Sequence, residues 1–162
     1  MRINAVEPNA GADEGPLELR ARAQDGCFVC GERNPRGLHL QYRREHDGAV
    51  TAEWRPAPHC EGFEGIVHGG IISTVLDEAM SKAVAAMNQE ALTGELRVRF
   101  RHHVVSGESL RIRGWVVGKT RRLIKTEAVL IAPDGSIRAH AWADFLALPG
   151  TSRPPGEPEG AK

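Results

Sequence analysis

The stretch from residue 65 to residue 79, GIVHGGIISTVLDEA, combines residue types that a helix built only for packing does not need. A histidine and two glycines stand directly before an apolar run, and that run contains an acid pair, Asp77 and Glu78. Backbone N–H groups in the first turn of a helix have no acceptor within the helix, and they favour negative charge. Gly69 and Gly70 would leave these groups uncovered by side chains. The pattern predicts a site in which a helix start stabilises an oxyanion and a carboxylate activates water or attacks directly.

The two neighbouring acids differ in their helical surroundings. Glu78 stands four residues before Lys82, a spacing that predicts an exposed ion pair on a helix. Asp77 shares its helical stripe with Ser73 and Ser81, between the apolar and polar faces, and it has no cation four residues later. We therefore expect Asp77 to be the reactive carboxylate, with a solvated acid on the helix flank as the alternative.

The periodicity around this stretch predicts one long helix followed by strands. Apolar residues at spacings of three and four predict a helix from Gly69 to about Met87. Alternating residues predict two strands, 38–43 and 49–55, joined at an Asp-Gly turn signal. Four further strand-like runs follow the helix, at 95–105, 109–119, 122–132 and 136–148. The sequence thus predicts an α+β domain in which a four-stranded antiparallel meander curls around one buried helix.

The chain of 162 residues is long enough for one domain with a real core, which we place at residues 25–148. The polar segment 1–24 and the Pro/Gly-rich segment 149–162 are predicted to be flexible. A net charge of zero argues against a nucleic-acid-coating or membrane-coating protein. No apolar stretch approaches the roughly 20 residues of a membrane span, and the N-terminus lacks the apolar core of a secretory signal, so a cytoplasmic protein is expected.

Three stretches together resemble a known family. They are GIVHGG followed by a helix with an acid, CFVCGERNPRGLHL, and LRVRFRHHVVSGESLRIRGWVV. They are similar to the hotdog-fold acyl-CoA thioesterases, especially the phenylacetyl-CoA thioesterase-like branch, over roughly Cys27 to Leu148. The resemblance implies a hotdog fold, hydrolysis of an acyl-CoA to acid and thiol, and no cofactor. It also implies a homo-oligomer, a dimer or a tetramer, whose sites are shared between two chains.

The resemblance also assigns roles to residues around the helix. Gly69 matches the backbone oxyanion donor, with Gly70 beside it, and Asp77 matches the catalytic carboxylate. His68 would support the oxyanion loop, although a histidine at a helix start is often only a cap. Ser81 matches a Ser or Thr position that orients water or the carboxylate in some relatives, and its alternative is a small packing residue.

One position departs from the family pattern. Many relatives carry Asn or Gln six residues before the histidine, where this chain has Gly62, preceded by Glu61. An ionised Glu61 cannot donate a hydrogen bond, so it either acts differently or takes that place through a backbone shift. The departure keeps open a protein that binds acyl-CoA without turning it over. A hotdog dehydratase is a further alternative, but the histidine that such an enzyme needs after RNP is missing.

Basic residues offer a place for the phosphates of coenzyme A. Arg97 and Arg99 share one face of a predicted strand, and Arg121 and Arg122 lie at a predicted turn. Arginine suits phosphate because its donors form a planar fork. The alternative is an ordinary solvated sheet face.

The cysteines raise the question of a metal. Cys27 and Cys30 have the spacing of half a zinc site, and His59 and Cys60 follow downstream. Adjacent His and Cys residues rarely both reach one ion, so we expect a pair of buried thiols and no metal. A zinc-dependent interaction module remains the last alternative.

Overall fold

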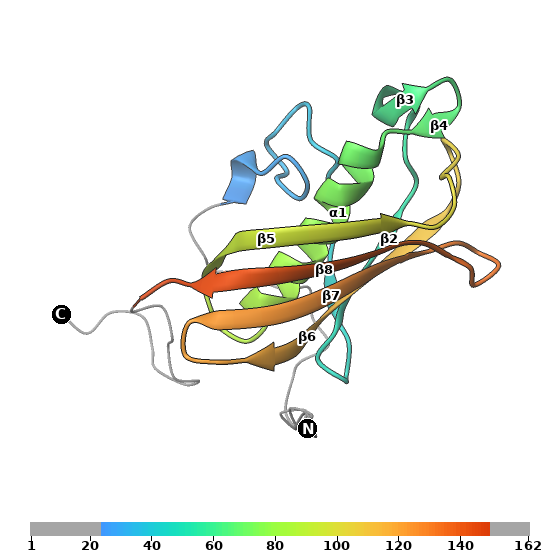
Figure 1. The fold of residues 1–162 in the computed structure, drawn as a ribbon. Helices are drawn as coiled ribbons and strands as arrows, with labels where there is room; N and C mark the ends of the chain where they lie inside the picture. The colour runs from blue at the N-terminus through green and yellow to red at the C-terminus, as the bar shows by residue number, and fades with distance from the viewer. Residues whose placement is uncertain (1–23, 150–162) are drawn as a thin grey trace.

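The computed structural model describes residues 24–149 as one helix held by a curled sheet (Figure 1). The helix α1 spans Gly69–Ala85. The main sheet contains β1 (Arg43–Arg44), β2 (Val50–Trp54), β5 (Ala91–Phe100), β6 (Leu110–Lys119), β7 (Leu123–Ile131) and β8 (Ile137–Ala147). Two short 3₁₀ turns, η1 (Gln24–Gly26) and η2 (Pro58–Cys60), and a hairpin of β3 (Glu61–Phe63) with β4 (Ile66–Val67) complete the domain. The terminal segments predicted to be flexible lie almost entirely outside the described residues.

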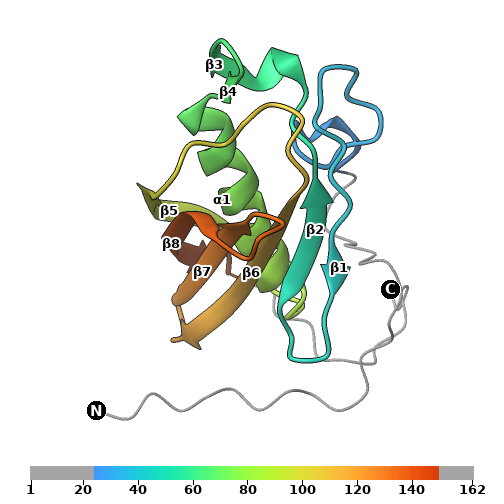
Figure 2. The ribbon, with the colours of Figure 1, turned by 90° about the vertical axis from the view of Figure 1, so that its right-hand side faces the viewer.

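The helix is buried along the predicted apolar stripe. Ile72, Leu76 and Ala79 are at most 3% exposed, and α1 packs against β2, β5, β6, β7 and β8. Val75 and Met80, which lie off that stripe, are also fully buried. The segment before the helix covers the side of Val75, where Tyr42 contacts it, and the sheet curls around the helix (Figure 2). The observed α+β arrangement, one central helix wrapped by an antiparallel sheet, is the predicted fold class.

The order of the strands corrects the prediction of a four-stranded meander. The sheet order is β1-β2-β6-β7-β8-β5, so β5 pairs with β8 and not with β6. The connection from β5 to β6 carries the chain to the other side of the sheet, where β6 pairs with β2. Alternation along a strand predicts the strand but not its partner, and sequential strands are not always neighbours. The consequence is that β5 lies at an edge of the sheet.

The segment before the helix is less regular than predicted. Only Arg43 and Arg44 form β1, whereas Leu40 and Tyr42 pack into the core without strand pairing. The Tyr42 hydroxyl donates to the carbonyl of Val75 over 3.1 Å and ties this segment to α1. In the described range 24–149, no helix has the length and apolar character to cross a membrane.

Candidate active site

The start of α1 offers one open backbone donor. His68 is the N-cap of the helix, and its Nδ1 accepts a hydrogen bond from the Gly70 N–H over 2.9 Å. The Gly70 donor is therefore occupied, and the imidazole fixes the first turn as an N-cap does. The Gly69 N–H has no acceptor within residues 24–149. Of the two glycines predicted to line the site, Gly69 is the one whose N–H is available to a ligand.

A pocket of about 560 Å³ opens beside this donor. Its walls come from the β3–β4 hairpin, the first turn of α1, and the end of β5 with the loop after it; they include Gly62, Phe63, His68, Gly69, Phe100 and His103. A Cβ atom at position 69 would lie 3.3 Å from the ring of Phe100, so the glycine lets the aromatic ring pack directly over the helix start. The pocket thus pairs a polar donor with aromatic walls, a combination that suits a carbonyl carrying an apolar group.

Gly62 and Glu61, at the position where the resemblance implies an amide residue, contact His68 and the β3–β4 turn. A Cβ atom at Gly62 would lie 2.9 Å from Cδ2 of His68, so a larger side chain would displace the imidazole. The carboxylate of Glu61 accepts a hydrogen bond from the Gly65 N–H over 3.0 Å. Glu61 therefore braces the turn between β3 and β4, and Gly62 makes room for His68.

Asp77 lies two turns further along α1, in a half-buried position facing Thr93 of β5. The Thr93 hydroxyl donates a hydrogen bond to Asp77 Oδ1 over 2.9 Å. Burial raises the pKa of Asp77 above its ordinary value; the Thr93 hydrogen bond opposes this shift, and the charge of Glu78 adds to it. Asp77 is thus a carboxylate held by a neutral donor, with its proton affinity raised by burial, as suits a general base. Ser81, one turn later, is half-buried.

Thr93 is the site residue that sequence reasoning missed. It lies near the start of β5, where the pairing with β8 shifts register between Thr93 and Glu95. Strict alternation along a strand predicts which side chains share a face, and a register shift changes that assignment. A hydroxyl residue shortly after the helix was the only signal in the sequence.

Glu78 occupies a different environment from the one predicted. It forms the expected ion pair with Lys82, at 3.2 Å, but the two side chains are only 16% and 7% exposed. The prediction of an exposed pair is therefore wrong. The segment that contains Cys27 and Cys30 covers this flank of α1, and a periodicity within the helix could not reveal that cover.

The predicted phosphate-binding arginines lie in two separate places. On the face of the sheet turned away from α1, the Arg97 guanidinium stacks over the Trp142 ring at 4.9 Å, and Arg99 pairs in register with His140. Arg121 and Arg122 form the exposed tip of the β6–β7 turn.

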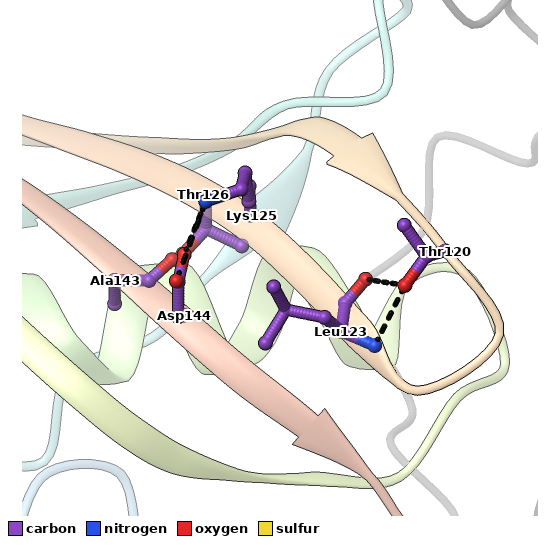
Figure 3. Close-up of polar contacts among 6 residues, drawn as sticks. All are labelled: Thr120, Leu123, Lys125, Thr126, Ala143 and Asp144. Carbon is purple, nitrogen blue, oxygen red and sulfur yellow. Dashed lines mark hydrogen bonds and ion pairs between the residues drawn. The ribbon is translucent and has the colours of Figure 1, made fainter.

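That turn is closed by bonds between Thr120 and Leu123 (Figure 3). It lies at the end of the sheet where β5 begins, because Leu123 pairs with the same residue of β8 as Leu92 does. Arg121 and Arg122 are therefore near the Thr93 end of β5 and far from the pocket at Phe100.

One chain does not bring Gly69 and Asp77 together. Eight residues separate them on α1, which corresponds to about 12 Å along a helix. Gly69 lies near Phe100, at the end of β5, whereas Asp77 contacts Thr93 near its beginning. The donor and the carboxylate thus face opposite ends of the same edge strand.

Comparisons with known proteins agree with this architecture. The model of the thioesterase superfamily matches residues 64–139, from the β3–β4 hairpin into β8. No curated protein gives a match.

Among solved structures, a thioesterase superfamily protein has a TM-score of 0.70 and 24% identity, and the match covers 72% of this chain but only 61% of that chain. The E. coli PaaI protein from the phenylacetic acid degradation operon has a TM-score of 0.65 and 15% identity, covering 70% of this chain and 83% of that one. A hypothetical thioesterase protein with coenzyme A from Streptococcus pneumoniae TIGR4 has a TM-score of 0.61 and 17% identity, covering 64% and 82%. These neighbours confirm the hotdog fold.

Proposed function

We propose that the protein hydrolyses an acyl-CoA, or a related acyl thioester, to the free acid and the thiol, because the model of the thioesterase superfamily matches residues 64–139 of this hotdog domain. The Gly69 N–H stabilises the oxyanion, and the Asp77 carboxylate activates water or attacks directly. His68 holds the donor loop, and Thr93 orients Asp77. Gly62 lines the pocket beside His68, and Gly70 holds the His68 imidazole through its N–H.

The observation that carries the proposal is the placement of the two groups at opposite ends of β5. This strand is an edge of the sheet, and its unpaired backbone groups are a template for another strand. Three large apolar side chains are exposed along it: Leu92, Leu96 and Phe100 at 62%, 37% and 50%. An edge of this kind favours a homodimer joined through β5.

Antiparallel pairing of two β5 strands about a two-fold axis completes the site. With the axis near the middle of the strand, Phe100 of one protomer comes opposite Thr93 of the partner subunit. The Gly69 donor beside Phe100 then approaches the partner subunit's Asp77, and the symmetry forms a second equivalent site. The same pairing brings Arg121 and Arg122 of one protomer toward the partner's pocket, where they could hold coenzyme A phosphates.

The chemistry needs few groups because a thioester is an activated acyl group. In the base route, Asp77 takes a proton from water, and the water oxygen attacks the carbonyl carbon. The carbonyl oxygen gains charge beside the Gly69 N–H, where one such donor contributes about 3 to 4 kcal/mol. The carbon–sulfur bond then breaks, and the thiolate leaves and takes up the proton.

A second candidate function is binding of acyl-CoA without turnover. Gly62 favours it, because this chain has no amide side chain where many relatives do, and His68 leaves no room for one. The two functions share the pocket and differ only in the reaction.

A panel of aryl, short-chain and medium-chain acyl-CoA esters, with detection of the released thiol, tests the proposal. Turnover of at least one ester supports hydrolysis. Saturable binding with no thiol release on any ester supports the binding protein instead.

Mixing two inactive variants tests the shared site. Asp77→Asn removes the carboxylate, and Gly69→Pro removes the donor N–H at the first helical position, where the φ of proline fits but the Phe100 ring, 3.3 Å from a Cβ atom there, must shift. Random exchange of chains should recover about a quarter of the wild-type activity, since half of the dimers are mixed and each has one intact site. No recovery from verified mixed dimers contradicts a site shared between two chains.

A further inference from the structure

The turn after η1 directs two thiols toward α1. The sulfur atoms of Cys27 and Cys30 and a carboxylate oxygen of Glu78 all lie within 4.8 Å of one another. Each of the three side chains is partly buried. The cluster joins two segments that are about fifty residues apart in sequence, and it lies on the flank of α1 that the proposed hydrolysis does not use.

The backbone of this turn is shaped around the Cys27 sulfur. The Val29 N–H donates to Cys27 Sγ over 3.4 Å, and the Gly31 N–H donates to the Cys27 carbonyl over 3.0 Å. A Cβ atom at Gly31 would lie 2.5 Å from the Cys27 nitrogen, so the turn requires glycine directly after the second cysteine. Backbone N–H groups directed at sulfur stabilise a thiolate and tune metal–thiolate centres.

The Glu78 carboxylate lies almost as close to the Cys27 sulfur as two ligands of one metal ion lie to each other. Cys27 Sγ is 3.9 Å from Glu78 Oε1. A sulfur about 2.3 Å and an oxygen about 2.0 Å from one tetrahedral ion are separated by about 3.5 Å. The other pairs of ligand atoms lie within 4.8 Å, so side-chain rotations that shorten these separations would close the three ligands on an ion.

We propose that Cys27, Cys30 and Glu78 bind a divalent ion of the zinc class, with water in the fourth position. Two thiolates and one carboxylate bring three negative charges to a doubly charged ion. The Lys82 ammonium, which lies 3.2 Å from Glu78 Oε1 and is 5% exposed as a residue, balances the remaining charge. The assembled site is neutral, as a partly buried site requires.

Soft thiolate ligands with one carboxylate favour zinc over magnesium or calcium, which prefer oxygen alone. His59 and Cys60, the downstream pair considered as the remaining ligands, do not join Cys27 and Cys30 in any metal-ligating group among residues 24–149. The ion would fasten the N-terminal segment to α1 one residue away from Asp77.

Metal content of the purified full-length protein, measured by plasma mass spectrometry after equilibration with zinc and gel filtration, tests the site. We expect about one zinc per chain, the stoichiometry of a single site, in the wild type. Cys27→Ser, Cys30→Ser and Glu78→Gln should each lower the retained zinc at least tenfold, while Cys60→Ser, which changes a buried thiol elsewhere, should retain it. Cobalt uptake by the wild type should produce a thiolate-to-cobalt charge-transfer band, a readout that does not depend on the folding of any variant.

Three outcomes overturn the proposal. The first is a wild-type protein that retains no zinc and gives no charge-transfer band with cobalt. The second is zinc that is retained equally by folded Cys27→Ser and Cys30→Ser variants, which would place the ion elsewhere. The third is a Cys27–Cys30 disulfide that persists in reductant and excludes metal. None of these results depends on thioester hydrolysis.

Discussion

Asp77 and Glu78 are neighbours in sequence, yet the two flanks of α1 that carry them differ in almost every physical respect. They point about 100° apart around the helix. Asp77 faces the edge strand β5, where the exposed Thr93 provides a single neutral donor. Glu78 faces the N-terminal segment and is paired with Lys82. Asp77 lies at the sheet edge β5, to which the proposed second chain would pair. Glu78 is enclosed by its own chain.

The difference supports the prediction that Asp77, and not Glu78, is the reactive acid. The Glu78 carboxylate is paired with the buried Lys82 ammonium and is itself only 16% exposed, so we expect its role to be structural. A carboxylate whose pKa is raised by burial, and which lacks a cationic partner, retains basicity that a reaction can use. The surroundings of each acid, rather than its residue type, decide the role.

Replacement of Asp77 should give the largest effect. Asp77→Asn keeps the size and removes the charge, so turnover should fall by about 100-fold to 10,000-fold, the usual scale for a positioned acid or base. Substrate affinity should change little, because the carboxylate acts mainly in the transition state. Initial rates and a binding titration measure both quantities.

The matched control is Asp144→Asn. Asp144 forms an exposed ion pair with Lys125 on the outer face of the sheet, at 3.2 Å (Figure 3). It should retain turnover within about threefold of wild type, as changes at solvated ion pairs do. Equal losses in the two variants would mean that charge alone, and not the position of Asp77, matters.

On the other flank, the main effect should be on stability. Lys82→Met keeps the apolar stem and leaves Glu78 as a buried charge without its ammonium. The free energy of unfolding should fall by about 3 to 5 kcal/mol, measured by urea denaturation at one protein concentration. Lys125→Met, which breaks the exposed pair with Asp144, should cost no more than about 1 kcal/mol. Similar losses for both lysines would contradict the contrast between an enclosed flank and an open one.

The sequence predicts the fold well because the dominant signals are local. Apolar residues at helical spacing identify α1, and they are buried because they can pack nowhere but against the sheet. The predicted helix end near Met87 is two residues late, since Ala85 is the last helical residue and Met87 is only half-buried. The order of the strands could not be predicted, because alternation gives a face and not a neighbour.

The site residues also divide into those that local sequence signals predict and those that depend on the packing of distant segments. The glycines and the acid on one helix, together with the resemblance to the thioesterases, predict roles for His68, Gly69 and Asp77, and these roles stay predictions. Thr93 and the cover over Glu78 depend on which distant segments pack against each flank, and no spacing within the helix contains that information. The separation of the donor and the carboxylate could be calculated from the sequence once the helix was assigned, and it is the physical reason to expect a second chain.

The smallest expected effect concerns Thr93. It tests most directly the flank of α1 that carries Asp77 and faces β5. Thr93→Val removes the hydrogen bond that holds the pKa of Asp77 down, while burial continues to raise it. The pKa of Asp77 should therefore rise further above 3.8, and the acid limb of kcat/KM should move to higher pH. At pH values well above that limb, the rate should fall by no more than about tenfold, the scale of one hydrogen bond.

The raised pKa of Asp77 also determines whether its ionisation raises or lowers the stability of the fold as the pH changes. Because the folded protein holds the Asp77 proton more tightly than the unfolded chain does, the stabilising contribution of the protonated group is present at low pH and is lost as the pH rises through the folded pKa. In Thr93→Val, the stabilising contribution of protonated Asp77 should persist to a higher pH than in the wild type. Thr51→Val removes a similar hydrogen bond, from Thr51 to Glu45 at 2.7 Å, and should leave the acid limb unchanged. An acid limb that stays in place in Thr93→Val, or that moves equally in both variants, would show that Thr93 does not control the ionisation of Asp77 and that the two flanks differ only in shape.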